Sequence, residues 1–196
     1  EKNSRGSLSL KERLTALRKQ LSDQNLDGFL VPLADEHQSE FPPLKAQRLA
    51  WLTGFTGSSG LAIVLRDRAA IFVDGRYTLQ VRRQVDPKLL EIKHIVNDPP
   101  ATWLKRNATK KTKIGYDPWL HTVDGLNKIT AQCEPAGVKF TAVEMNPIDR
   151  VWKNQPVAPL APVFIHPASL AGRSARDKIK SVAETLSKNG ATAAIL

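Results

Sequence analysis

Two short apolar runs, 61–65 and 69–73, constrain the fold more than any other feature of the chain. They read LAIVL and AAIFV, and only Arg66, Asp67 and Arg68 separate them. Short apolar runs joined by a few polar residues predict a pair of strands with a tight connection. Strands that lack polar alternation are buried on both faces. We therefore expect this pair in the interior of a sheet, with helices on both sides.

Helical and extended patterns alternate around the strand pair. Ser9 and Glu12 form a capping-box pattern, which predicts a helix from there to about residue 25. Further helices are predicted at 44–52, at 77–85 and after Asp98 as N-cap. Another is predicted at 122–137, between Thr122 and the stop at Gly137, with Val123 as its first apolar position. Further strands are predicted at 29–31, 89–96, 113–117 and 139–143. This alternation is typical of an α/β domain, which we expect to span 1–154.

The composition changes after this domain. Residues 155–162 contain three prolines, which predicts a proline-rich linker. Beyond it come a strand-like run at 163–165, a helix that begins at Ser174, and a second apolar run at 191–196. A unit this small cannot bury a core of its own. We therefore interpret 163–196 as the truncated beginning of a second, similar domain.

The chain is basic, with 29 Lys and Arg against 19 Asp and Glu and a formal charge of +10. Part of the excess is local, because the stretch 104–113 holds five basic residues and no acid. Clustered basic residues are the usual footprint of a nucleic-acid binder. However, only 6% of the residues are aromatic, and no recognition motif is present. The stretch is better interpreted as a solvated turn, and a basic nucleic-acid or anionic-surface binding module is the alternative.

The most conspicuous local motif is the glycine-rich loop, GFTGSSG at 54–60. A phosphate-binding loop needs a strand before it, a helix after it and a lysine, whereas here a helix precedes and a strand follows. A nucleophile elbow needs Gly-x-Ser-x-Gly between a strand and a helix, and neither Ser58 nor Ser59 fits that spacing. We therefore predict a tight loop that glycine permits and that leads into the strand 61–65.

Few other residues suggest chemistry. Asp35, Glu36, His37 and Glu40 could supply metal ligands or acid–base groups, but two neighbouring ligands do not close a metal site. Cys133 is the only cysteine, which excludes an internal disulfide and favours a reducing, cytoplasmic setting. No apolar run approaches the roughly 20 residues of a membrane helix, so no membrane partner is expected. The residues alone predict a soluble α/β domain without a complete active site.

Three segments carry a family resemblance: DEHQSEF at 35–41, WLTGFTGSSG at 51–60 and DGRYTLQ at 74–80. In this order and spacing they resemble the N-terminal domain of aminopeptidase P, the Xaa-Pro aminopeptidases of the creatinase/prolidase superfamily, in its three-domain form. NPIDRVW at 146–152 and AGRS at 171–174 resemble the end of the family's first domain and the start of its second. Two departures are Phe41, where the family usually has Tyr, and Ser59, where it often has Ala.

The resemblance implies a mixed, roughly six-stranded sheet flanked by helices, similar in outline to ribonuclease H. It implies that the full-length protein removes the N-terminal residue before a proline. In the family, a C-terminal pita-bread domain does this chemistry with two divalent metal ions, typically manganese, held by Asp, His and Glu residues. None of those ligands falls within this chain, so we expect neither catalytic nor metal-binding residues here and no activity of the chain alone. A related pita-bread protein without peptidase activity is a second alternative.

In the family, the N-terminal domain lies near the mouth of the active site and contributes domain or dimer contacts. Glu40 is therefore our first candidate: its carboxylate would bind the substrate's free α-amino group or an arginine across a subunit contact, with a loop-end salt bridge as the plainer interpretation. His37 and Asp35 accompany it. Arg76 and Tyr77 are expected to be structural, with the Arg76 guanidinium holding the glycine-rich loop. The implied partners are the protein's own middle and catalytic domains, proline-containing peptides and a second copy.

Overall fold

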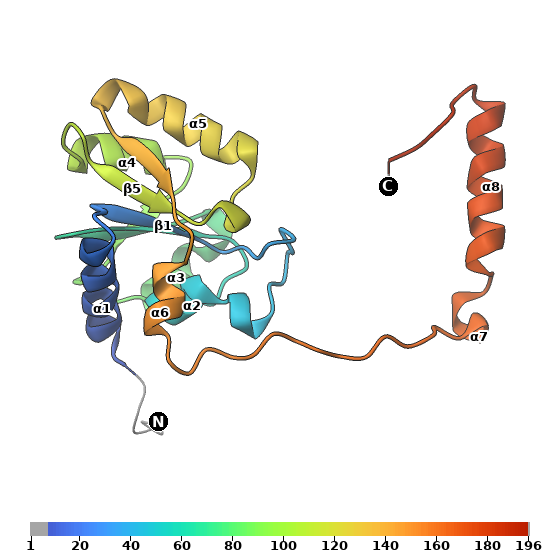
Figure 1. Ribbon diagram of the computed structural model, residues 1–196, viewed down its shortest axis with the longest axis horizontal. Helices are drawn as coiled ribbons and strands as arrows, with labels where there is room; N and C mark the ends of the chain where they lie inside the picture. The colour runs from blue at the N-terminus through green and yellow to red at the C-terminus, as the bar shows by residue number, and fades with distance from the viewer. Residues whose placement is uncertain (1–7, 196) are drawn as a thin grey trace. The chain divides into compact units, whose positions relative to one another are not determined.

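Six short strands form one mixed sheet in the computed structural model, which describes residues 8–195 (Figure 1). The strands are β1 (Gly28–Pro32), β2 (Leu61–Leu65), β3 (Ala69–Val73), β4 (Glu91–His94), β5 (Lys113–Tyr116) and β6 (Lys139–Ala142). Their order across the sheet is β4-β3-β2-β1-β5-β6. Only β2 runs antiparallel to its neighbours, and the other adjacent pairs are parallel. The expected mixed six-stranded sheet is confirmed.

The predicted strand pair lies in the interior of this sheet. β2 and β3 pair in antiparallel register from Leu61 opposite Phe72 to Val64 opposite Ala69. The backbone N–H of Leu65 donates to the carbonyl of Arg68 at 2.8 Å and closes the connection. Every residue of β3 is buried. The apolar runs are buried on both faces because helices cover both sides of the sheet.

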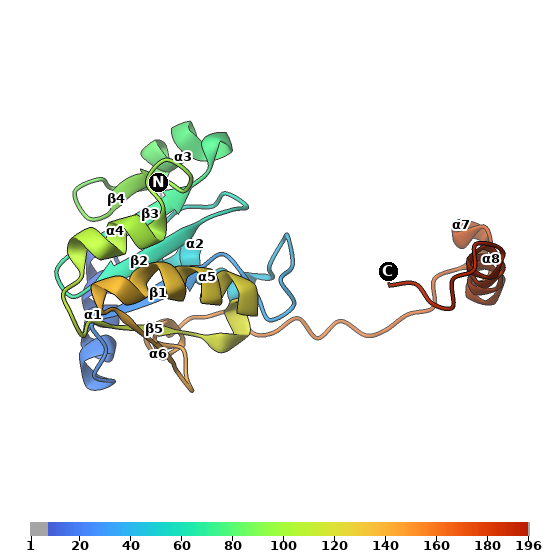
Figure 2. The same ribbon diagram turned by 90° about the horizontal axis from the view of Figure 1, so that it is seen from above.

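The helices form two layers (Figures 1 and 2). One face carries α1 (Leu10–Asp23), α2 (Arg48–Thr53), α3 (Thr78–Gln84) and α6 (Pro147–Val151), and the other carries α4 (Pro100–Asn107) and α5 (Val123–Cys133). Strand residues alternate between the two cores: Phe29 and Val31 pack with the first layer, and Leu30 packs with the second. Both cores therefore depend on the two-residue period of the strands.

Local signals place most helix ends where the sequence predicts them. The Ser9–Glu12 capping box is formed, and the Thr122 hydroxyl accepts from the Gly125 N–H at 3.1 Å. The short 3-10 turns η1 (Leu44–Ala46), η2 (Gly75–Tyr77), η3 (Pro118–Leu120) and η4 (Glu134–Ala136) complete the elements before residue 158. Gly137 ends the last of these turns in a left-handed conformation, as predicted.

Three local predictions are wrong. The helix predicted at 44–52 breaks at Gln47, whose ψ of 46° is not helical, so η1 and α2 are separate. Asp98 does not cap α4, because its carboxylate pairs with Lys93 at 3.2 Å and Arg106 at 3.4 Å, and Pro99 takes the cap position. Val123 lies on the solvent side of α5 rather than in the core.

The chain divides into two compact units, one ending at Ala158 and one beginning at Pro159. The second contains α7 (Ala168–Ala171) and α8 (Ala175–Lys188), with Ser174 as the predicted cap. The strands predicted at 163–165 and 191–196 are not formed within the described residues, and Leu196 lies outside them. Phe164 is exposed, as is Ile179 on α8. An apolar run becomes a strand only with a neighbour to share its hydrogen bonds, and none is present among residues 159–195.

None of the helices within 8–195 is both long and apolar enough to cross a membrane.

Candidate functional site

One edge of the sheet collects the segments that the sequence singles out. Because β2 alone is reversed, the loops after β1, β3, β4, β5 and β6 meet the loop before β2 at the same edge, which we call the carboxyl edge. Residues 35–41 follow β1, the glycine-rich loop 54–60 precedes β2, and residues 74–77 follow β3. β1, β2 and β3 are adjacent, so these three segments are neighbours there. Ligand sites of α/β folds commonly occupy this edge.

Asp35 holds the first of these loops in shape. Its side chain is buried, at 2% exposure, and Oδ1 accepts the backbone N–H groups of His37 at 3.0 Å and Ser39 at 2.9 Å. Burial alone would raise the pKa of Asp35, but the hydrogen bonds from Ser39 and His37 outweigh it, so the pKa is lowered. The carboxylate therefore acts within its own loop, where Gln38 takes a left-handed φ of 54°.

The tip of this loop faces solvent. Glu36, His37 and Glu40 are exposed, and Phe41 is 77% exposed. Glu40 lies near enough to Arg76 to contribute to that residue's raised pKa, which is caused mainly by a hydrogen bond with Asp74 and in smaller part by the charge of Glu40. Among the described residues, the ion pair of Arg76 is with Asp74 and not with Glu40.

Arg76 is held against its own turn. Its Nε and Nη2 donate to the two carboxylate oxygens of Asp74 at 3.1 and 2.8 Å, and its guanidinium lies 5.1 Å from the ring centre of Tyr77. The hydrogen bond from Arg76 lowers the pKa of Asp74 to about 2. Asp74 therefore stays ionised at neutral pH, and Arg76 keeps one fixed direction.

Tyr77 contacts the glycine-rich loop directly. Its hydroxyl lies 2.6 Å from Ser58 Oγ, and its ring packs edge-on against Phe55 at 5.5 Å. Gly57 packs directly against the Phe55 ring, and only glycine fits there, because a Cβ would come within 2.3 Å of that ring.

Gln84 also contacts the glycine-rich loop directly. Its side chain accepts the Thr56 N–H at 3.0 Å and donates to the Thr56 hydroxyl at 2.8 Å. The prediction that the Arg76 guanidinium holds this loop is wrong, since its hydrogen bonds go to Asp74. The predicted tight loop leading into β2 is confirmed.

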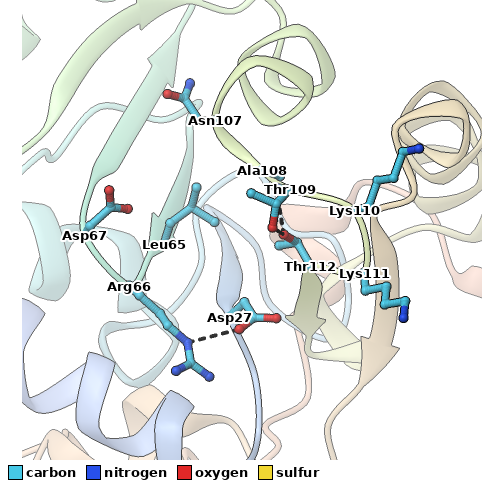
Figure 3. A pocket seen from close by; sticks show the side chains of 10 residues that line it. All are labelled: Asp27, Leu65, Arg66, Asp67, Asn107, Ala108, Thr109, Lys110, Lys111 and Thr112. Carbon is cyan, nitrogen blue, oxygen red and sulfur yellow. Dashed lines mark hydrogen bonds and ion pairs between the residues drawn. The ribbon is translucent and has the colours of Figure 1, made fainter.

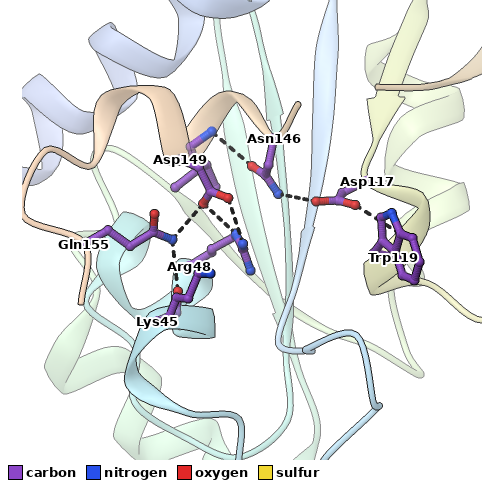
Figure 4. Close-up of polar contacts among 8 residues, drawn as sticks. Lys45, Arg48, Asp117, Trp119, Asn146, Asp149 and Gln155 are labelled. Atoms are coloured by element: carbon purple, nitrogen blue, oxygen red, sulfur yellow. Dashed lines mark hydrogen bonds and ion pairs between the residues drawn. The ribbon is translucent and has the colours of Figure 1, made fainter. Parts of the chain in front are cut away.

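A partly buried polar network, which the sequence did not predict, joins α2, α6 and Gln155 (Figure 4). Arg48 donates from Nε and Nη2 to the two oxygens of Asp149 at 2.7 and 2.8 Å, joining α2 to α6. The Gln155 side chain donates to Asp149 at 2.8 Å and to the Lys45 carbonyl at 3.0 Å. Asp149 lies within the NPIDRVW motif at 146–152, which is the sequence signal that could have found it, whereas Arg48 and Gln155 lie outside that motif.

Hydrogen bonds that involve the neighbouring Asn146 and Asp117 hold the backbone of an exposed tryptophan, Trp119, at the carboxyl edge (Figure 4). Asn146 donates to Asp117 Oδ2 at 2.9 Å and caps α6 through the Ile148 N–H at 3.0 Å. Asp117 Oδ1 accepts the Trp119 N–H at 3.0 Å. The Trp119 side chain is 74% exposed although its backbone is fixed. The carboxyl edge therefore presents aromatic surface as well as charge.

Several acidic side chains at the carboxyl edge are engaged within their own turns. Within residues 8–195, no three His, Cys, Asp or Glu side chains are placed to hold a metal ion. Asp35 and Asp74 are occupied by hydrogen bonds inside their own turns. Glu40 remains as an exposed carboxylate near a fixed guanidinium. That arrangement suits the binding of a charged group better than bond cleavage.

Comparisons with known proteins confirm the family resemblance that the motifs indicated. The sequence model of the creatinase/prolidase N-terminal domain matches residues 13–151. The chain is 32% identical to Xaa-Pro aminopeptidase 2 from Sus scrofa over 90% of its length, and 34% identical to a probable Xaa-Pro aminopeptidase P from Aspergillus niger over 94%.

Solved structures show the same fold. An X-prolyl aminopeptidase from Caenorhabditis elegans, described as a cytosolic enzyme with a di-nuclear active site, covers 93% of the chain with a TM-score of 0.78 and 26% identity. The N-terminal domain of peptidase PepQ from Mycobacterium tuberculosis covers 71% with a TM-score of 0.56 and 25% identity. The chain spans 26%, 31% and 32% of the S. scrofa, A. niger and C. elegans proteins, but 97% of the PepQ domain. The chain belongs to the creatinase/prolidase N-terminal domain family.

Proposed function

We propose that this chain is the non-catalytic N-terminal part of a metal-dependent Xaa-Pro aminopeptidase, which removes the residue before a proline. The observation that carries the proposal is the carboxyl edge, where the three family motif segments meet and exposed Glu40 lies on a loop held by Asp35. A preorganised charge loses little entropy on binding, so it is suited to a weakly held ligand end or to a subunit contact. The edge would assist substrate access and domain or dimer contacts.

Glu40 has the central role in this proposal. Its carboxylate would accept hydrogen bonds from the free α-amino group of a peptide or from an arginine of a second copy. Such charge-assisted hydrogen bonds are stronger than neutral ones. Exposed Phe41 and Trp119 supply apolar surface on the same edge. His37 lies in the Glu40 loop, three residues before Glu40, and faces solvent.

The metal ions belong to another part of the proposed protein. The described residues do not fit a metal site, so two divalent ions, manganese by our proposal, would be held by a catalytic domain outside this chain. The di-nuclear active site named for the C. elegans relative supports two ions. We further propose a cytoplasmic homodimer, and the cytosolic setting named for the same relative supports the compartment.

The test is Glu40→Gln in the full-length protein. Loss of one charge-assisted hydrogen bond lowers kcat/KM for an Xaa-Pro peptide by about tenfold or more, or shifts the monomer–dimer equilibrium measured by sedimentation. Glu36→Gln is the matched control, because Glu36 is an exposed glutamate in the same loop. Unchanged kcat/KM and unchanged dimerisation in the Glu40 variant would contradict the role of Glu40.

The assignment of chemistry to another domain has its own test. The 196-residue chain, supplied with Mn²⁺ and an Xaa-Pro peptide, is expected to release no N-terminal residue above the rate without protein. Measurable cleavage that follows protein concentration would overturn the assignment.

A further inference from the structure

The opposite edge of the sheet, which we call the amino edge, has a different character. There the β2–β3 turn at 66–68 and the loop 108–112 line a cavity of about 250 Å³ together with Asp27 (Figure 3). Arg66 pairs with Asp27 at 3.0 Å, and Arg68 pairs with Asp67 at 3.0 Å. The arginines of this edge are therefore neutralised by their own neighbours.

Four lysines of the same edge are not neutralised: Lys110, Lys111, Lys113 and Lys139, here called the edge lysines. Each is exposed, and none forms an ion pair with any residue in 8–195. Two acids line the cavity, but Asp27 is occupied by Arg66 and by the Lys113 backbone N–H at 2.9 Å, and Asp67 is paired with Arg68. The local positive charge is therefore uncompensated.

The fold gathers these lysines. Lys113 on β5 lies directly opposite Lys139 on β6, although like charges in register repel one another. Gly137, at a φ of 75°, lets the backbone of Lys110 approach to 3.4 Å from where a Cβ would be. The Lys111 N–H donates to the Gly137 carbonyl at 2.9 Å, with Lys111 itself held at a φ of 74°. The repulsion between neighbouring lysines is unfavourable for the free protein, and a bound anion would relieve it in part.

We propose that the edge lysines bind the phosphate backbone of a nucleic acid without reading its sequence. Lys110 and Lys111 point in different directions, away from Arg66 and Asp27 (Figure 3). They do not close around a compact anion, whereas an extended row of phosphates can contact both. Lysine is a common phosphate binder that acts as a point charge.

Other features of the edge narrow the choice of partner. No large exposed apolar side chain among the described residues falls in 104–113 or 137–140, so the patch lacks the anchors that help a basic surface hold a membrane. For the same reason it lacks aromatic platforms on which bases could stack, which excludes sequence readout by stacking. The contact between the edge lysines and the nucleic acid would be electrostatic. It would leave the carboxyl edge free to bind another ligand.

The experiment measures binding of a fluorescent single-stranded 20-mer of mixed sequence to the 196-residue chain as salt is varied. Four lysine–phosphate contacts predict a slope of about −3 for log K against log salt. Replacing all four edge lysines by Gln is expected to remove this salt dependence. The control replaces four other exposed lysines, Lys11, Lys45, Lys88 and Lys153, by Gln, so both variants fall equally from +10 to +6.

Loss of binding in the edge variant, with retention in the control at an unchanged melting temperature, supports the proposal. Equal weakening of both variants would assign binding to net charge and overturn it. Tighter binding to vesicles containing phosphatidylserine or to a poly-glutamate peptide than to the oligonucleotide would also overturn it, because the partner would then be of another class.

Discussion

At the scale of the single residue, the hydroxyl pair of Tyr77 and Ser58 fixes the glycine-rich loop. The two oxygens are 2.6 Å apart, and the partners lie on either side of β2 and β3 in the sequence. The same ring packs against Phe55 and under the Arg76 guanidinium. One side chain therefore links a loop before β2 to the turn after β3.

This linkage predicts a specific stability change. Tyr77→Phe keeps the ring and removes only the hydroxyl, so it should lower the free energy of unfolding by about 1 kcal/mol, and Ser58→Ala should do the same. The double variant should lose less than the sum, because both changes remove one hydrogen bond. Chemical denaturation of the three variants measures this coupling. Strictly additive losses would show that the hydroxyls do not interact.

Residue identity alone could not predict these partners. The sequence predicts structural roles for Arg76 and Tyr77 and assigns the contact with the glycine-rich loop to the Arg76 guanidinium. In the structure Asp74, two residues away, satisfies the guanidinium first. An acid close in the sequence competes with distant groups for the hydrogen bonds of the guanidinium. Which of them binds it depends on backbone positions that the sequence does not show.

At the scale of the element, α2 and α6 are joined by the Arg48–Asp149 pair. The Arg48 side chain is 10% exposed and that of Asp149 29%, so both are largely removed from water. Breaking one partner of a buried pair leaves an uncompensated charge, which is more damaging than losing a surface pair.

Arg48→Met is therefore expected to lower the free energy of unfolding by about 3 kcal/mol. Arg68→Met is the matched control, because its pair with Asp67 is 46% and 68% exposed and should be worth less than about 1 kcal/mol. Thermal or denaturant unfolding of the two variants compares them directly. A similar, small loss in both would mean that Asp149 is adequately solvated or held by Gln155 alone.

Several elements with a local signal were predicted correctly, although the local signals at Gln47 and Asp98 misled, because Gln47 is not helical and Asp98 pairs with Lys93 and Arg106 instead of capping α4. The Ser9 and Thr122 caps and the buried β2–β3 pair depend on residues within a few positions of each other, and all are present. The run 163–165 has the composition of a strand but no strand beside it. The position of the carboxyl edge depends on the order and direction of the strands, including the reversal of β2. Both are visible only in the structure.

At the scale of the whole molecule, the sheet separates two kinds of surface. The carboxyl edge holds the family's motif segments and a fixed charge cluster, whereas the amino edge holds uncompensated lysines. The direction of the strands places them at opposite ends of the sheet. A ligand at one edge therefore need not compete with a ligand at the other.

The first compact unit extends beyond its last helix to Ala158. The sequence predicts a domain over 1–154, whereas the compact unit ends at Ala158. The difference includes Gln155, whose side chain bonds Asp149 and the Lys45 carbonyl. A chain of residues 1–158 should keep these contacts, and a chain of residues 1–154 should lose them.

We therefore expect the 1–154 chain to unfold with a free energy about 1–3 kcal/mol lower than that of the 1–158 chain, at roughly 0.5–1.5 kcal/mol for each of the two hydrogen bonds. Gln155→Ala in the 1–158 chain should reproduce most of this loss, which separates the side chain from the mere shortening of the backbone. Denaturant unfolding of the three chains measures both effects. If 1–154 and 1–158 were equally stable, Gln155 would contribute nothing and the first unit would end at its last helix, α6, with Trp152 as its C-cap, because only the Gln155 bonds extend its packing further.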